Sequence, residues 1–233
     1  MIHIRCFQDE SDALSEASDF IWLRFFGSDG KTPEGSLCRL KQVHSTKVLF
    51  VSDYMRDFQR SDRPEGDGLY SVEPGERLCI RTADCLPLVL WSRKRDFLAV
   101  LHAGWRGLFR GILEEAVRTY QRRGGRAADL SMLCGPCISR DAFEVGPELM
   151  DELRQTPLTE EELSFVSTAG KGDRLHMDLA MIAALIAMHQ GLSANHLSIY
   201  RSCTYSSPES WYSFRRSGTA SPANLTCAAI RAG

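Results

Sequence analysis

The sequence lacks the features that mark membrane-spanning, exported and nucleic-acid-binding chains. Its most apolar stretch, Leu179–Met188, is far shorter than the ~20 residues of a transmembrane helix. The N-terminal residues alternate like a strand and contain no apolar core of a signal peptide. With a formal net charge of -2, the chain offers no bulk attraction to nucleic acid or anionic lipid. We therefore expect a cytoplasmic monomer that binds no membrane and no nucleic acid and acts on a small ligand.

Cysteine, in contrast, is frequent, with eight residues in 233. A chain without an export signal keeps its thiols reduced in the cytosol, so free cysteines are expected throughout. Cys6, Cys38, Cys79 and Cys227 lie in or beside apolar runs, which predicts buried structural side chains. These four residues are therefore assigned to the core.

Apolar runs and helical periodicities indicate more strands than helices. Runs rich in β-branched and aromatic residues predict strands over Ile2–Phe7, Ile21–Phe26, Val48–Val51, Leu78–Ile80, Leu86–Trp91, Phe97–Leu101, Leu130–Leu133, Leu197–Tyr200 and Leu225–Ile230. Helical spacing predicts helices over Leu108–Arg122, Glu148–Arg154 and Met177–His189. The two kinds of element do not alternate regularly, so the pattern favours an α+β fold over a doubly wound sheet.

One cysteine and two histidines from separate segments suit a zinc site with an open fourth position. Cys85 stands at the turn into one predicted strand and His102 closes the next, so a hairpin would bring them to the same end of the sheet. His44 lies in a third, polar segment. Asp67 and Asp84 are natural hydrogen-bond partners for ligand imidazoles. Without His44, Cys85 and His102 would be explained equally well as a buried thiol and a hydrogen-bonded core imidazole as by a metal site.

Glycine and arginine residues that follow this pair suit an anion. Gly104 and Gly107 allow a close backbone approach or a sharp turn into the helix predicted from Leu108. Free amide groups and the positive dipole end at the start of that helix attract phosphate, and Arg106 lies beside them. The segment Tyr212–Arg216 combines aromatic and basic residues, which fits either a solvated turn or a pocket wall.

The segment Cys134–Cys137, Cys-Gly-Pro-Cys, has the letters of a thioredoxin-like redox motif. Such a motif opens a long helix, whereas this segment follows an apolar run and precedes only a brief segment. The context therefore predicts a strand that ends in a Gly-Pro turn. A structural zinc knuckle would need a second closely spaced pair of ligands, which the sequence does not contain.

Six motifs occur in an order that resembles the YfiH-like family, also called the laccase-domain or polyphenol oxidase family. They are Lys-Gln-Val-His at 41–44, Gly-Asp-Gly-Leu at 66–69, Thr-Ala-Asp-Cys-Leu-Pro at 82–87, His-Ala-Gly-Trp-Arg-Gly at 102–107, Gly-Pro-Cys-Ile at 135–138 with Phe-Glu-Val at 143–145, and Ser-Phe-Arg-Arg at 213–216. The resemblance extends over nearly the whole chain. The chain departs from the family pattern at Thr219–Ser221 and at Cys134.

The resemblance implies one α+β domain over residues 1–233, with a mixed β-sheet packed by helices, related to deamidating toxins that use a Cys-His pair. It also implies zinc, with copper as an alternative, on His44, Cys85 and His102, which would be catalytic as well. Family members are described as enzymes that phosphorolyse adenosine, inosine, guanosine and methylthioadenosine to the base and a ribose 1-phosphate, and that deaminate adenosine. The expected partners are therefore purine nucleosides and phosphate.

Further residues receive roles within that expectation. Asp84 is expected to handle protons, because it adjoins Cys85. The expected substrate-binding and phosphate-binding residues are Gln42, Arg106, Arg215 and Arg216.

Three alternatives stay open. A cysteine hydrolase or deamidase would use Cys85 as nucleophile and His102 as base. A copper-dependent polyphenol oxidase would need many histidine ligands, and six histidines with only two well placed do not supply them. A non-enzymatic module with structural zinc would need a fourth ligand, for which the sequence offers no clear residue.

Overall fold

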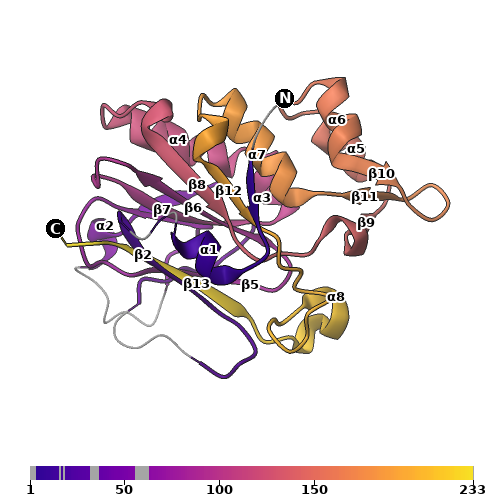
Figure 1. Ribbon diagram of the computed structural model, residues 1–233, viewed down its shortest axis with the longest axis horizontal. Coiled ribbons are helices and arrows are strands. Elements are labelled where there is room, and N and C mark those ends of the chain that lie inside the picture. The colour runs from indigo at the N-terminus through magenta and orange to yellow at the C-terminus, as the bar shows by residue number, and fades with distance from the viewer. Residues whose placement is uncertain (1–3, 16, 18, 32–36, 56–62, 233) are drawn as a thin grey trace.

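The computed structural model describes residues 4–15, 17, 19–31, 37–55 and 63–232, which are arranged in three layers (Figure 1). Two helices, α4 (Ile112–Arg122) and α7 (Leu179–His189), cover one face of a seven-stranded sheet. A three-stranded antiparallel sheet covers the other face. The α+β fold with a mixed sheet packed by helices is therefore confirmed.

The central sheet mixes parallel and antiparallel pairs. Its order is β1-β12-β8-β6-β7-β4-β3, in which β1, β12 and β8 run parallel, β4 and β3 run parallel, and the pairs between β8 and β4 are antiparallel. These strands are β1 (Arg5–Phe7), β3 (Val48–Phe50), β4 (Gly68–Ser71), β6 (Leu86–Ser92), β7 (Leu98–Ala103), β8 (Leu130–Cys134) and β12 (Leu197–Tyr200). Both faces of β6 and β7 are covered, which explains their continuous apolar sequences. Residues 2 and 3 of the first predicted strand lie outside the described residues.

The smaller sheet packs face to face on the central one. It consists of β2 (Ile21–Phe26), β13 (Asn224–Ile230) and β5 (Leu78–Thr82), with β13 in the middle. Its inner side chains include Leu23, Ile80 and Ala228, which share one apolar cluster with Val89 and Val100 of the central sheet. The second apolar cluster lies on the opposite face of the central sheet, beneath α4 and α7. The central sheet is thus buried between two cores.

Cys79 and Cys227 occupy paired positions on β5 and β13 and form a disulfide, with their Cα atoms 4.3 Å apart. The expectation of free thiols throughout is therefore wrong for this pair, because the sequence does not show the register that places the two sulfur atoms together. Cys38 is buried as predicted. Cys6 is exposed and not buried, since β1 is an edge strand of the central sheet.

The helix predicted over Leu108–Arg122 consists of two helices, α3 (Trp105–Phe109) and α4. Gly111 separates them, and its φ of 98° is a conformation that glycine adopts without strain. Ile112, Ala116 and Tyr120 recur at helical spacing along α4 and are buried in the core between this helix and the central sheet. The helical character of the segment is therefore confirmed, but the predicted start and continuity of the helix are wrong.

The remaining elements are short. They are α1 (Glu10–Ser15), α2 (Ser52–Met55), β9 (Glu144–Val145), α5 (Glu148–Leu153), α6 (Glu160–Val166), β10 (Ser167–Ala169), β11 (Leu175–Met177) and α8 (Phe214–Ser217), with 3-10 turns at 127–129, 140–142, 194–196 and 218–220. The strands β10, β11 and β9 form a third sheet in that order. No helix within the described ranges is long and apolar enough to span a membrane.

Candidate functional site

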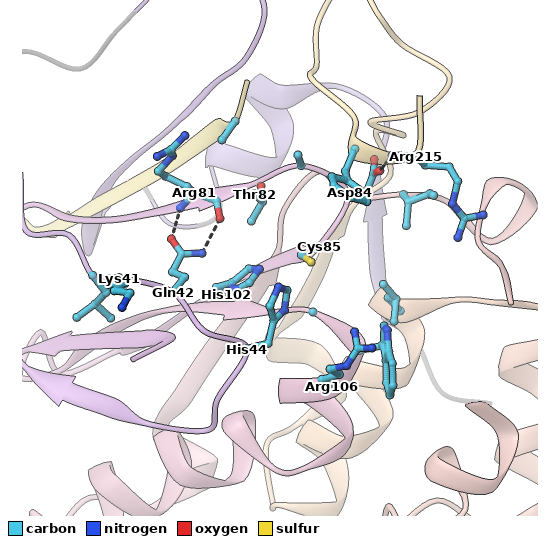
Figure 2. Close-up of a pocket in the computed structure, with 18 of the residues that line it drawn as sticks. Lys41, Gln42, His44, Arg81, Thr82, Asp84, Cys85, His102, Arg106 and Arg215 are labelled. Atoms are coloured by element: carbon cyan, nitrogen blue, oxygen red, sulfur yellow. Dashed lines mark hydrogen bonds between the residues drawn. The ribbon is translucent and has the colours of Figure 1, made fainter. Parts of the chain in front are cut away.

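Two histidines and a cysteine meet at the edge of the central sheet where β6 begins and β7 ends (Figure 2). Cys85 directly precedes β6, and His102 is paired with Pro87 in the β6–β7 ladder, so the predicted hairpin is confirmed. His44 approaches from the segment before β3, and ligand atoms of the three side chains all lie within 4.8 Å of one another. We call these three residues the triad. The described residues contain no other group of histidine, cysteine and acidic side chains with this spacing.

The buried carboxylate of Asp67 accepts hydrogen bonds from both histidines of the triad. Its Oδ1 accepts hydrogen bonds from His102 Nδ1 at 2.8 Å and from the His44 amide at 3.0 Å. Its Oδ2 accepts from the amide and the hydroxyl of Ser45, at 2.6 and 2.7 Å, and from the Val43 amide at 3.2 Å. Because Nδ1 of His102 is engaged, Nε2 is the ring nitrogen left for a ligand. Asp67 therefore makes the type of contact that the sequence predicted.

The two imidazoles of the triad have opposite electrostatic environments. Burial alone would lower the pKa of His102, but hydrogen bonds to Asp67 and Cys85 outweigh it and raise this pKa to about 9. Burial likewise acts to raise the pKa of Asp67, yet its hydrogen bonds with His102 and Ser45 lower it to about 2. Burial and the neighbouring His102 lower the pKa of His44, so that imidazole is neutral at pH 7.

Two residues of this region have a backbone conformation that L-residues rarely adopt. The φ angle is 59° at His44 and 84° at Asp84, and Arg95 is the only further non-glycine residue with positive φ in the described part of the chain. Such conformations cost on the order of 1–3 kcal/mol each and persist where surrounding contacts hold them, commonly at functional sites. The hydrogen bonds of Asp67 supply those contacts for His44.

Gly104 forms the floor beside the triad. A Cβ atom at this position would lie 2.9 Å from Cys85 Sγ and 2.9 Å from His44 Nδ1, so any other residue would occupy the space between the ligand atoms. Gly104 is also the N-cap of α3, which begins at Trp105 and not at the predicted Leu108. Gly107 therefore lies inside α3 and is buried, and not in a loop before the helix, because α3 begins three residues before Leu108.

The triad lies on the wall of a cavity of about 1090 Å³, which is at the upper end of the size range of small-molecule sites. Its apolar lining includes Leu40, Trp105, Ile138, Phe143, Leu179 and Phe214. Its basic lining residues are Lys41, Arg63, Arg81, Arg106 and Arg215, and its acidic ones are Glu65 and Asp84. The cavity therefore suits a ligand with both an apolar ring and negative charge.

Asp84 faces the C-terminal segment and not the triad (Figure 2). Its Oδ1 accepts from the Thr204 hydroxyl at 2.6 Å, and its Oδ2 accepts from the Ser213 hydroxyl at 3.0 Å and the Arg215 amide at 2.6 Å. Both oxygens therefore accept hydrogen bonds from the C-terminal segment, and the proton transfer expected of Asp84 stays a prediction. Asp84 holds the first turn of α8 and with it the course of Arg215.

Two of the expected binding residues use their side chains within the protein. Gln42 lines the cavity, but its amide donates to the Arg81 carbonyl at 2.7 Å and accepts from the Arg81 amide at 2.8 Å. Arg216 donates to the carbonyls of Thr204, Tyr205 and Trp211 at 2.6 to 2.9 Å. Arg216 is also absent from the cavity lining. Arg216 thus anchors a loop and Gln42 holds the backbone of Arg81, and the substrate-binding roles expected of both residues stay predictions.

Arg106 and Arg215 do line the cavity, as expected. The guanidinium of Arg106 stacks on the Trp105 ring, 4.2 Å from its centroid. Arg215 donates to the carbonyls of Ala142 and Glu144 at 3.3 and 3.1 Å. Stacking orients a guanidinium without consuming its N–H donors, so Arg106 has the larger capacity for an anion.

Sequence reasoning missed Arg63 and Arg81 as cavity residues. The signal for Arg81 is its place as the exposed residue between the buried Ile80 and Thr82 of β5, in the period-two pattern of a strand. Arg63 carries no such signal. The Cys-Gly-Pro-Cys segment ends β8 in a turn with both thiols free and buried, which confirms the structural interpretation.

The sequence and the fold were compared with those of known proteins. A family model described as multi-copper polyphenol oxidoreductase laccase matches residues 24–228. A purine nucleoside phosphorylase from Pseudomonas aeruginosa is 36% identical over 178 residues, which cover 76% of this chain and 68% of that protein. The adenosine deaminase RL5, from an unknown prokaryotic organism, is 28% identical over 191 residues, which cover 80% and 72%. The match to a relative from Bacillus subtilis spans only 53% of that relative's length.

A solved structure has the same architecture. The crystal structure of YlmD from Geobacillus stearothermophilus matches with a TM-score of 0.77 at 26% identity, covering 84% of this chain and 74% of that one. The family model spans most of the chain, including all three residues of the triad. The chain is therefore a member of the laccase-domain family, to which the YfiH-like proteins belong.

Proposed function

We propose that the chain is a metal-dependent enzyme of purine nucleosides, which phosphorolyses them and also deaminates adenosine in the same cavity. The observation that carries the proposal is the triad of two imidazoles and one thiol on the wall of a cavity lined by arginines. The names of two similar proteins, purine nucleoside phosphorylase and adenosine deaminase, support this substrate class. The proposed nucleosides are adenosine, inosine, guanosine and methylthioadenosine.

The donor set of the triad fits a thiophilic divalent ion. Imidazole nitrogen and thiolate sulfur are both zinc ligands, and three protein ligands leave the open position of a catalytic site; copper is the alternative for such ligands. Gly104 keeps the space between these atoms open, and Asp67 fixes the ring orientation of His102. His44, Cys85 and His102 would therefore hold the ion. When bound, zinc supplies Lewis-acid chemistry and lowers the pKa of water.

Phosphorolysis requires a cation that holds phosphate near C1′ of the ribose while the purine leaves. Arg106 has an exposed guanidinium that stacks on Trp105 and lines the cavity. Arg215 lines the same cavity, with its backbone course set by Asp84. We assign the attacking phosphate to Arg106, with Arg215 as the neighbouring cation, because charge-assisted hydrogen bonds to phosphate are strong and directional.

The apolar side chains of the cavity suit a purine ring. The cavity lining includes Phe143, Leu179, Phe214 and Ile138. The two phenylalanine rings provide flat apolar surface on which a purine can stack. In phosphorolysis the phosphate attacks C1′, and in deamination water attacks C6 with loss of ammonia. A nucleoside whose purine is held by this apolar surface can present either C1′ of its ribose or C6 of its purine, so one cavity can serve both reactions.

The proposal is tested by chromatography of the products formed by zinc-loaded protein from adenosine, with and without phosphate. Adenine is expected only when phosphate is present, and inosine in its absence. Cys85→Ala should abolish both products. Cys203→Ala, which removes a partly exposed thiol outside the triad, should retain them. Absence of any product from the wild-type protein would overturn the proposal.

A second function is favoured by one observation. Cys85, His102 and Asp67 are joined by hydrogen bonds in that order, which is the arrangement of a nucleophile, its base and the residue that orients the base. A cysteine hydrolase or deamidase would use them in these roles. Metal-free protein would then be inactivated irreversibly by a thiol alkylator at Cys85, and an amide substrate would protect it. Retention of full amidase activity in Cys85→Ala would exclude this function.

A further inference from the structure

Three arginines stand together on one side of the cavity, and we call Arg39, Arg63 and Arg81 the arginine wall. Arg63 and Arg81 are exposed and line the cavity, and Arg39 is half-buried close to both. Arg39 and Lys41 alternate with buried residues along an extended segment, so they share its outer face. None of the three arginines has a role in the proposed reaction.

Backbone hydrogen bonds place the segments of the arginine wall side by side. Residues 38–41 bond to residues 77–79 through the amide and carbonyl of Cys38, and to residues 64–66 through the amide and carbonyl of Lys41. The side chain of Gln42 then clamps the backbone of Arg81 with two hydrogen bonds. The wall is thus built on a fixed backbone, with Arg63 and Arg81 on the surface of the cavity and Arg39 beside them, outside its lining.

The carboxylates described around the cavity are engaged elsewhere. Glu65 pairs with Lys41 at 2.8 Å, and Asp84 accepts the three hydrogen bonds given above. Among the described residues, no acceptor bonds to a guanidinium of the arginine wall. Burial and the nearby Arg63 and Arg81 lower the pKa of Arg39. Like charges that have no counterion within the described part of the chain are expected to attract an anion.

Arg81 of the arginine wall and the cations assigned to the attacking phosphate lie on different sides of the triad. In Figure 2 the triad lies between Arg81 on one side and Arg106 and Arg215 on the other. One phosphate ion therefore does not serve both sets of arginines. The cavity of about 1090 Å³ is also larger than a nucleoside requires, which leaves room for a second anionic group.

We infer that the arginine wall binds a phosphate group carried by the substrate, so that purine nucleoside 5′-phosphates are the preferred substrates. This inference rests on the proposed function, because it places the purine and C1′ as described there. The 5′ carbon is the end of the ribose that projects away from the purine. A phosphate on it extends from the reacting bond toward the far side of the triad.

The reaction on such a substrate is balanced without a further reactant. An oxygen of inorganic phosphate forms a bond to C1′ while the bond from C1′ to N9 breaks. The purine leaves with that electron pair and takes up a proton, and the other product is ribose 1,5-bisphosphate. The arginine wall contacts only the 5′-phosphate and takes no part in bond making.

The inference is tested by isothermal titration of adenosine 5′-monophosphate and of adenosine into the protein. The wild-type protein should bind the monophosphate about ten- to hundredfold more tightly, as one or two charge-assisted hydrogen bonds predict. The combined variant Arg39→Ala, Arg63→Ala, Arg81→Ala should lose this preference, and Arg81→Lys should keep part of it. Arg110→Ala is the matched control, because it removes an exposed arginine that does not line the cavity.

The outcomes separate the inference from the proposed function. Equal affinities in the wild-type protein, or a preference that survives the combined variant, would overturn the inference. Product chromatography on the same samples tests the function independently. If adenosine is turned over and the protein binds the monophosphate no more tightly than adenosine, only the inference is refuted. A binding preference without product from either compound removes the proposed function and leaves the arginine wall as a phosphate site.

Discussion

Replacing Gly104 by alanine should disable the triad while leaving the fold in place. The added Cβ atom would lie 2.9 Å from both Cys85 Sγ and His44 Nδ1, whereas ordinary van der Waals contact begins at 3.4 Å. Each ligand atom must therefore move by about 0.5 Å, which changes the spacing of the triad at the cavity wall. The backbone itself accepts alanine, because φ at Gly104 is -62°.

The cost to stability and the cost to metal binding differ in size. Gly104 is the N-cap of α3, where glycine is preferred to alanine by roughly 1 kcal/mol, equivalent to about 2–4 °C in Tm for a chain of this length. Zinc binding should weaken about 10- to 100-fold, the loss that follows when the support of a ligand is removed. The variant should therefore be folded at room temperature and deficient in metal.

The assay is competition for zinc with a chromophoric chelator, with thermal unfolding followed by circular dichroism on the same samples. Gly107→Ala is the matched control in the same helix. Its Cβ would meet the carbonyl oxygens of Ser45 and His102 at 3.1 and 3.7 Å and a methyl group of Ile112 at 3.8 Å, none of which is a ligand atom. Wild-type zinc affinity in Gly104→Ala, or an equal loss in both variants, would refute the expectation.

Three further results are expected. Asp84→Ala leaves two hydroxyls and an amide without their acceptor, which should lower the free energy of unfolding by about 1–3 kcal/mol in urea titrations; wild-type stability would contradict this. The disulfide between Cys79 and Cys227 predicts that alkylation of the unfolded, unreduced protein labels six of the eight cysteines, whereas eight labels would show that the bond is absent. Reduction should cost roughly 2–5 kcal/mol. A hydrogen bond with Arg126 is the main cause that lowers the pKa of Asp129 below 3.8, so this carboxylate stabilises the fold above that pH and loses its effect as the pH falls. Asp129→Asn should therefore lower the urea midpoint of unfolding at neutral pH, and the difference from the wild-type protein should become smaller in acid. A difference of the same size at both pH values would count against this account.

The strands could be predicted from the sequence because each depends on a local pattern. The runs Ile21–Phe26 and Leu197–Tyr200 have the predicted bounds, since apolar and aromatic residues begin and end both runs and fill most of their positions. The strand Gly68–Ser71 was missed, because its four residues contain no β-branched side chain. The disulfide was missed for a different reason: Cys79 and Cys227 are 148 residues apart, and only the register of two strands brings them together.

The candidate site shows the same division between local and long-range information. Cys85 and His102 could be placed together because they flank one hairpin. The partners of Asp84 could not, since Thr204 and Ser213 follow it by 120 and 129 residues. Adjacency in the sequence therefore predicted a role for Asp84 beside Cys85, whereas its hydrogen bonds to the C-terminal segment could not be foreseen.

The position of β13 along the chain has a consequence for synthesis. This strand lies between β2 and β5, so the small sheet stays incomplete until residues 224–230 have left the ribosome. Until then Val89, Trp91 and Val100 on one face of the central sheet lack their cover. Domains fold while the chain is being made, and uncovered apolar surface promotes aggregation. Of the two cores, the one under the small sheet is therefore the one that stays open to solvent longer during synthesis, until the strand inserts.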